Sequence, residues 1–191
     1  MSIGTQSYTA VNSSPETPHT EPVRVLAISP FSQDHLTLQS IISHSKWVLR
    51  TTSTYAEALE ILREDLMPVV ITERDLPPYS WKDVLTKLAS MTNPPRLIVA
   101  SDNADASLWG EVLNLGAYDV LPKPFESAEL FPSVSSAWRA WKYSEAMRLH
   151  HYNKNCESAG VPSESLLSMP PNRKTVGRAV HIKEQLRAIC G

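Results

Sequence analysis

The sequence predicts a doubly wound α/β fold, in which helices cover both faces of a five-stranded parallel sheet. Five short apolar runs alternate with segments of helical periodicity, and this alternation is typical of parallel strands connected by helices. Capping residues, glycine and proline mark the boundaries between the two kinds of segment. The expected strands are Val23–Ile28, Trp47–Thr51, Val69–Thr72, Arg96–Ala100 and Tyr118–Leu121.

Three helices have clear boundary signals. Thr54 and Glu57 match the capping box, so a helix is expected to begin just after Thr54. A helix at Trp81–Met91 is followed by asparagine and two prolines, and a helix at Asp105–Leu115 ends at Gly116, a typical C-terminal stop.

The first and last helices are less sharply bounded. The first is expected near Ser32–Ser43, where apolar residues recur at helical spacing. The last opens near Ser127 and is expected to run past Tyr143 into Arg148, because the only proline lies in its first turns, where proline is tolerated.

Composition divides the 191-residue chain into one domain with appendages. Residues 1–22 are rich in Ser, Thr, Pro and Glu and are predicted to be a disordered leader, residues 23–144 the domain, and residues 145–191 the extended last helix, a linker and a weakly helical tail. Residues 1–137 hold nine Lys and Arg against sixteen Asp and Glu, whereas residues 138–191 hold nine against four. The body is acidic and the tail is basic.

Cysteine usage and hydropathy predict a cytoplasmic protein. Cys156 and Cys190 both lie in the tail and suggest neither a disulfide framework nor a zinc site. The segment Met1–Glu21 lacks the basic start and apolar centre of a signal peptide, and no run approaches the roughly 20 apolar residues of a membrane span.

Two motifs give the chain a family resemblance. Residues 116–125 read Gly-Ala-Tyr-Asp-Val-Leu-Pro-Lys-Pro-Phe, and residues 73–77, after the third apolar run, read Glu-Arg-Asp-Leu-Pro. With the order and spacing of the strands, these resemble the response-regulator receiver domains of two-component phosphorelays over roughly Val23 to Lys142. The resemblance implies a flavodoxin-like fold and a role in phosphorelay signalling.

The resemblance also implies a phosphoryl-binding site, and this chain has the family's residues at some of its positions. In receivers, a Ser or Thr after the fourth strand and a Lys after the fifth hold the phosphoryl oxygens. Ser101 and Lys123 stand at these positions, and Pro124 matches the proline that follows the lysine, often through a cis bond.

The other positions of the site are changed. The acceptor aspartate is replaced by Glu73, and the acidic pair that binds Mg²⁺ with it is replaced by Ser29 and Pro30. Val120 occupies the position of the switch aromatic. Asp34 is expected to lie too far into the first helix to replace the missing pair.

The charge balance of this altered site argues against a metal. Three carboxylates near one lysine destabilise each other unless a divalent cation or a phosphoryl group is bound. Here Glu73 and Lys123 remain as a neutral pair, with Ser101 expected to supply a hydrogen bond. We therefore expect no metal and no cofactor, with Mg²⁺ binding lost.

Two roles are open for Glu73. Its carboxylate reaches roughly 1.5 Å further than that of aspartate, toward the space a phosphoryl group would occupy, so it would partly imitate the phosphorylated state. Alternatively, Glu73–Lys123 is a relic ion pair that only holds strand ends together. Asp75 and Asp102 lie near the same rim and are expected to form turns or caps.

A tryptophan pair marks the last helix. Trp138 and Trp141 are spaced to form one ridge with Ala137. Core packing and an exposed face for a partner or a second copy are both compatible with this spacing, and we expect the ridge to be partly buried and partly an interface.

The sequence thus predicts a pseudo-receiver that binds signalling proteins, a histidine kinase or a downstream regulator, or forms a homodimer, without contacting membranes. No Gly-rich phosphate loop, paired cysteines or Gly-x-Ser-x-Gly elbow is present, so it is not expected to be an enzyme. The alternatives are a receiver that accepts phosphate at a non-standard site, and a transcriptional regulator that binds nucleic acid through the basic tail.

Overall fold

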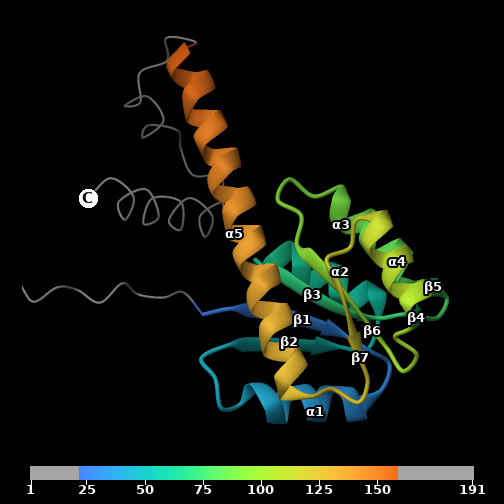
Figure 1. Cartoon of the computed structure of the whole chain (residues 1–191). Coiled ribbons are helices and arrows are strands. Elements are labelled where there is room, and N and C mark those ends of the chain that lie inside the picture. The colour runs from blue at the N-terminus through green and yellow to red at the C-terminus, as the bar shows by residue number, and fades with distance from the viewer. Residues whose placement is uncertain (1–21, 159–191) are drawn as a thin grey trace, which may run out of the picture. The chain divides into compact units, whose positions relative to one another are not determined.

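The computed structural model describes residues 22–158, and these contain a five-stranded parallel sheet with the strand order β2-β1-β3-β6-β7 (Figure 1). This order is that of the flavodoxin-like doubly wound folds, so the predicted fold class is confirmed. The strands are β1 (Arg24–Ile28), β2 (Val48–Thr52), β3 (Val69–Glu73), β6 (Arg96–Ser101) and β7 (Asp119–Pro122).

Helices cover both faces of the sheet, as expected for parallel strands joined by helices (Figure 1). Side chains of α1 and α5 pack into one apolar cluster, and those of α2, α3 and α4 into the other. The predicted leader up to Glu21 and the tail from residue 159 onward lie outside the described residues. The helices are α1 (Ser32–Ile42), α2 (Tyr55–Glu64), α3 (Trp81–Ala89), α4 (Ala106–Leu115) and α5 (Ser127–Ser158).

The helix boundaries follow the capping signals with one variation. The backbone N–H of Glu57 donates to the Thr54 hydroxyl at 3.2 Å, whereas the Glu57 carboxylate accepts from the hydroxyl of Thr52 rather than closing the predicted box. Asp105 caps α4 by accepting from the Leu108 N–H at 2.8 Å. Gly116 ends α4 at a φ of 98°, a left-handed conformation that glycine adopts readily.

A short hairpin between β3 and α3 was not predicted. Strands β4 (Asp75–Leu76) and β5 (Tyr79–Ser80) pair antiparallel around a cis Pro77–Pro78 peptide. At its end, the backbone N–H and the hydroxyl of Ser80 both donate to Asp83, at 2.8 and 2.9 Å, and so begin α3.

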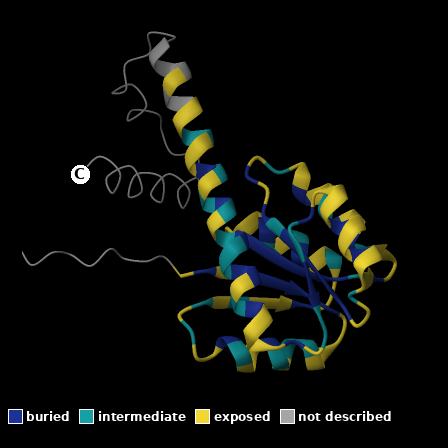
Figure 2. Ribbon diagram, viewed as in Figure 1, coloured by how far each residue is buried: buried dark blue, intermediate teal, exposed yellow. Residues whose placement is uncertain are grey.

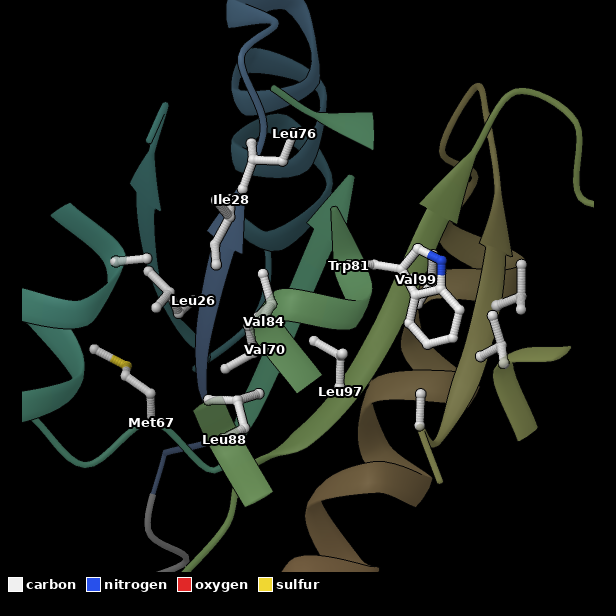
Figure 3. Packing of buried hydrophobic residues seen from close by; sticks show 14 of the residues in the cluster. Leu26, Ile28, Met67, Val70, Leu76, Trp81, Val84, Leu88, Leu97 and Val99 are labelled. Carbon is white, nitrogen blue, oxygen red and sulfur yellow. The ribbon is translucent and has the colours of Figure 1, made fainter. Parts of the chain in front are cut away.

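The central strands β1, β3 and β6 are the most deeply buried part of the domain, as their dark blue colour in Figure 2 shows. In the cluster of Figure 3, Leu26, Val70 and Leu97 from neighbouring strands face Val84 and Leu88 from α3. Burial extends to the last residue of β3, so Glu73 ends a strand in which every residue is buried. The carboxylate of Glu73 therefore lies at the end of β3 in a position that is largely shielded from water.

Helix α5 is longer than predicted, ending at Ser158 with Pro132 near its start. The contacts divide the chain into two units at Trp141, three residues before the domain boundary expected from the sequence. Trp138 packs partly buried against the cluster of α1 and α5, and Trp141 is only 2% exposed. The expectation that Trp141 contributes to an interface is therefore wrong, because its side chain offers almost no surface. Within residues 22–158, no helix has the combination of length and apolar character needed to cross a membrane.

Candidate functional site

The candidate site lies at the carboxyl edge of the sheet, where ligands bind in open α/β folds. Glu73 is the last residue of β3 and Ser101 the last of β6. Ser29 directly follows β1, and Lys123 directly follows β7. Because parallel strands end at the same edge, four positions far apart in the sequence meet there.

The predicted contact between Glu73 and Lys123 is present. The Lys123 ammonium donates to the Glu73 carboxylate at 2.7 Å, and both side chains are 7% exposed. At this burial the ion pair is poorly screened by water and salt, and loss of either partner would leave an uncompensated buried charge.

Asp34 joins the same lysine, so the expectation that it lies too far away is wrong. The Lys123 ammonium donates to the Asp34 carboxylate at 3.0 Å, and the same Asp34 oxygen accepts from the Ser29 hydroxyl at 2.6 Å. The turn after β1 is short and α1 starts at Ser32, so Asp34 lies in the first helical turn. Side chains of a helix point back toward its N-terminus, here toward the edge of the sheet.

Ser101 occupies the expected place but not the expected role. Its hydroxyl accepts from the Asn103 N–H at 3.2 Å, and its carbonyl accepts from the Lys123 N–H at 3.0 Å. Ser101 therefore positions the backbone around the site, while Asp34 supplies the additional hydrogen bond to the lysine.

Two further groups approach the ammonium of Lys123. It lies over the ring of Phe31 at 4.8 Å from the centroid, a distance suited to a cation–π interaction. The Asp102 carboxylate is 4.0 Å away, and the side chain of Asp102 is 84% exposed. Asp102 thus adds negative charge at the rim without being buried in the site.

The pKa values follow from one lysine shared by several carboxylates. Burial lowers the pKa of Lys123, but hydrogen bonds to Glu73 and Asp34 outweigh that effect and raise it above the usual value. Burial raises the pKa of Glu73 above its usual value, because the hydrogen bond and charge of Lys123 compensate only in part and Asp34 and Asp102 add repulsion. The raised pKa of Lys123 favours its protonated, charged form, whereas the raised pKa of Glu73 disfavours its charged carboxylate form.

The remaining positions of the resemblance lie around this centre. Val120 is buried in the cluster of α2, α3 and α4 and offers no ring that could rotate to the surface. The Lys123–Pro124 peptide is cis, as the resemblance implies. Tyr118, just before β7, shares a hydrogen bond of 2.7 Å with Ser136 of α5.

The side chains at the place where the resemblance implies Mg²⁺ are engaged with one another. Mg²⁺ needs several oxygen ligands in octahedral geometry. Pro30 has no side-chain donor, the Ser29 hydroxyl bonds to Asp34, and Asp34 and Glu73 each direct an oxygen at the Lys123 ammonium. Within residues 22–158, no three His, Cys, Asp or Glu side chains are grouped in a way that could hold a metal ion.

Comparison with known proteins agrees with the fold. The family described as response regulator receiver domain matches residues 33–135, over half of the chain. The chain therefore belongs to the receiver-domain family of two-component signalling.

The transcriptional regulatory proteins CutR of Streptomyces coelicolor and Streptomyces lividans are each 37% identical over 84 residues, 44% of this chain and 39% of the relative. The match thus covers about two fifths of the length of these relatives.

Solved structures share the fold at low identity. The signal receiver domain of an HD domain-containing protein from Pseudomonas fluorescens Pf-5 aligns with a TM-score of 0.61 at 21% identity, covering 71% of this chain and 99% of that one. The beryllofluoride-activated NtrC4 receiver domain dimer aligns at 0.57 with 19% identity, covering 62% and 98%. The adenylate cyclase from Rhodopirellula baltica aligns at 0.62 with 16% identity, covering 69% and 98%.

Proposed function

We propose that this chain is a pseudo-receiver, which acts in a cytoplasmic two-component pathway by binding other proteins without taking up phosphate and without catalysis. The observation that carries the proposal is the 2.7 Å bond between Glu73 and Lys123. A carboxylate of the chain itself already holds the lysine that would stabilise an added phosphoryl group.

The chemistry of phosphoryl transfer supports the same conclusion. Transfer to a carboxylate depends on a cation that neutralises the developing charge. With Ser29 and Pro30 after β1 and Glu73 in place of aspartate, the donor set for Mg²⁺ is lost. The site then has a structural task, holding the edge of the sheet in one arrangement that partners recognise.

The partners we propose are signalling proteins of the same pathway, either a histidine kinase or a downstream regulator. A second copy of the chain is another partner of this kind, since a related receiver fold has been solved as a dimer. Whether Glu73 imitates phosphorylation or is a relic pair is decided by partner affinity. Glu73→Gln weakens partner binding if Glu73 is a mimic and leaves it unchanged if it is a relic.

The proposal is tested by an amide-resolved NMR spectrum of the full chain, titrated with Mg²⁺ and then with beryllofluoride, which imitates a phosphoryl group on receivers. We expect the signals of Glu73, Ser101 and Lys123 to stay in place. A saturable shift of these signals would instead establish the alternative, a receiver that accepts phosphate at a non-standard site.

A transcriptional role is the second candidate, supported by the name of the relative CutR and by the excess of basic residues in 138–191. Phosphate contacts make DNA binding strongly dependent on salt. DNA binding that weakens with salt and disappears when residues 153–191 are deleted would favour this role. An absence of binding at low salt would remove it.

A further inference from the structure

A continuous chain of hydrogen bonds crosses the candidate site. The Ser29 hydroxyl donates to Asp34 at 2.6 Å, Lys123 donates to the same Asp34 oxygen at 3.0 Å, and Lys123 also donates to Glu73 at 2.7 Å. These bonds connect the turn after β1, the first turn of α1, the turn after β7 and the end of β3. Apart from Asp34, every group in the chain lies at a strand end.

We propose that Asp34 is a positioning residue of this site: it is a second internal anion that keeps Lys123 engaged within the chain and ties α1 to the end of β7. This inference rests on the proposed function, in which Lys123 is bound by carboxylates of the chain itself. It adds that Asp34, and not Glu73 alone, binds the lysine.

The geometry around the ammonium group supports this role. An ammonium has three N–H donors. Two are used by Glu73 and Asp34, while the ring of Phe31 and the carboxylate of Asp102 lie within 4.8 and 4.0 Å of the same nitrogen. An incoming oxyanion would find one N–H donor left on Lys123 and would meet the negative charges of Glu73, Asp34 and Asp102 around it.

Burial distinguishes Asp34 from the other acidic neighbour of the lysine. The side chain of Asp34 is 13% exposed, whereas that of Asp102 is 84% exposed. A charge pair removed from water is screened little, whereas an exposed pair of the same charges contributes little. The two aspartates are therefore a matched pair for experiment.

A groove lies beside the two segments that the bond joins. Gln33, Leu36 and Thr37 of α1 lie on either side of Asp34 in the sequence and line a groove of about 340 Å³ together with Phe125, which follows Lys123 by two residues. The Asp34–Lys123 bond, whose two residues do not line the groove themselves, joins α1 to the turn after β7. Its loss would loosen α1 relative to that turn.

The test compares Asp34→Asn with Asp102→Asn in the full chain. Each variant removes one negative charge near Lys123, but only the first removes an ionic hydrogen bond. For Asp34→Asn we expect the pKa of Lys123 to fall. This pKa is measured by NMR titration of the Lys123 Cε signal. We also expect the amides of α1 and of Phe125 to exchange hydrogen on the order of tenfold faster, as the loss of one charged hydrogen bond implies.

The control and the rescue complete the design. Asp102→Asn is expected to leave the exchange of α1 unchanged, and Asp34→Glu to restore part of the protection and of the Lys123 pKa. The proposal is overturned if Asp34→Asn leaves both readouts unchanged, or if Asp102→Asn alters them equally.

The result is independent of the proposed function. A saturable response of the wild-type chain to beryllofluoride would overturn the pseudo-receiver, yet faster exchange of α1 in Asp34→Asn would still establish the positioning role. The converse outcome is that the wild-type chain shows no response to beryllofluoride while Asp34→Asn shows no change in the exchange of α1. That pair of results would support the pseudo-receiver and overturn the role of Asp34.

Discussion

The candidate site has two halves that differ in chemistry although they belong to one sheet: the ends of β6 and β7, and the ends of β1 and β3. On the side of β6 and β7, Ser101, Lys123 and Pro124 retain the residues of ordinary receivers, and the cis peptide is kept. On the side of β1 and β3, Ser29 and Pro30 stand where the resemblance implies the acidic pair, and Glu73 stands where it implies the acceptor aspartate. The lysine retained on one side is thus bound by two carboxylates, Glu73 at the end of β3 and Asp34 of α1.

The largest expected effect comes from removing the residue that joins the two halves. Lys123→Met leaves the carboxylates of Glu73 and Asp34 facing each other without their cation, and losing one partner of a buried ion pair costs about 3–5 kcal/mol. We expect a loss of that size in the free energy of unfolding, measured by urea denaturation at pH 7.

Lys82→Met is the matched control, because Lys82 pairs with Glu111 at side-chain exposures of 52% and 42%. An exposed pair contributes less than about 1 kcal/mol. Equal losses in the two variants would show that the buried site does not hold the halves together.

The retained half is expected to follow ordinary backbone rules. Gly116→Ala places a side chain at a φ of 98°, where no atom lies within 4 Å of the added carbon, so its cost is conformational and amounts to about 1–2 kcal/mol. Gly110→Ala, in the middle of the same helix and equally unobstructed, is expected to stabilise by about 0.5–1 kcal/mol. Thermal unfolding of both variants should therefore shift in opposite directions, and a shift in the same direction would contradict the left-handed cap.

The changed half is expected to show an unusual dependence on pH. The folded-state pKa of Glu73 lies above its unfolded value of 4.5, so the folded chain holds this proton more tightly than the unfolded chain does. The contribution of Glu73 to stability is then full below that value and is lost as pH rises through the raised pKa.

We expect Glu73→Gln to cost about 1 kcal/mol at pH 7, the value of one hydrogen bond, with the difference from wild type growing as the pH is lowered toward 4.5. Urea denaturation of both proteins across this range measures the difference. A difference that shrinks toward low pH would mean that Glu73 is stabilised as a carboxylate instead.

The same contrast describes how far the sequence predicts the structure. Hydrophobic periodicity is sufficient to place the five strands, whereas the contact of Glu73 with Lys123 was predicted from the resemblance to receivers. Asp34 was missed because its reach depends on the length of the turn after β1 and on the backward tilt of helical side chains, neither of which is visible as a motif. The hairpin of β4 and β5 was missed because two-residue strands show no periodicity.

A small effect is also expected for the retained hydroxyl. In ordinary receivers the residue at this position holds a phosphoryl oxygen, whereas here the Ser101 hydroxyl accepts a single backbone N–H, from Asn103. Ser101→Ala should therefore cost about 0.5–1.5 kcal/mol in unfolding free energy and leave the Lys123 pKa unchanged, since its hydrogen bonds to Glu73 and Asp34 do not involve Ser101. NMR titration of the Lys123 side chain measures this pKa directly. A marked change would mean that Ser101 acts on the lysine after all and that the retained half still works as in a phosphate-binding receiver.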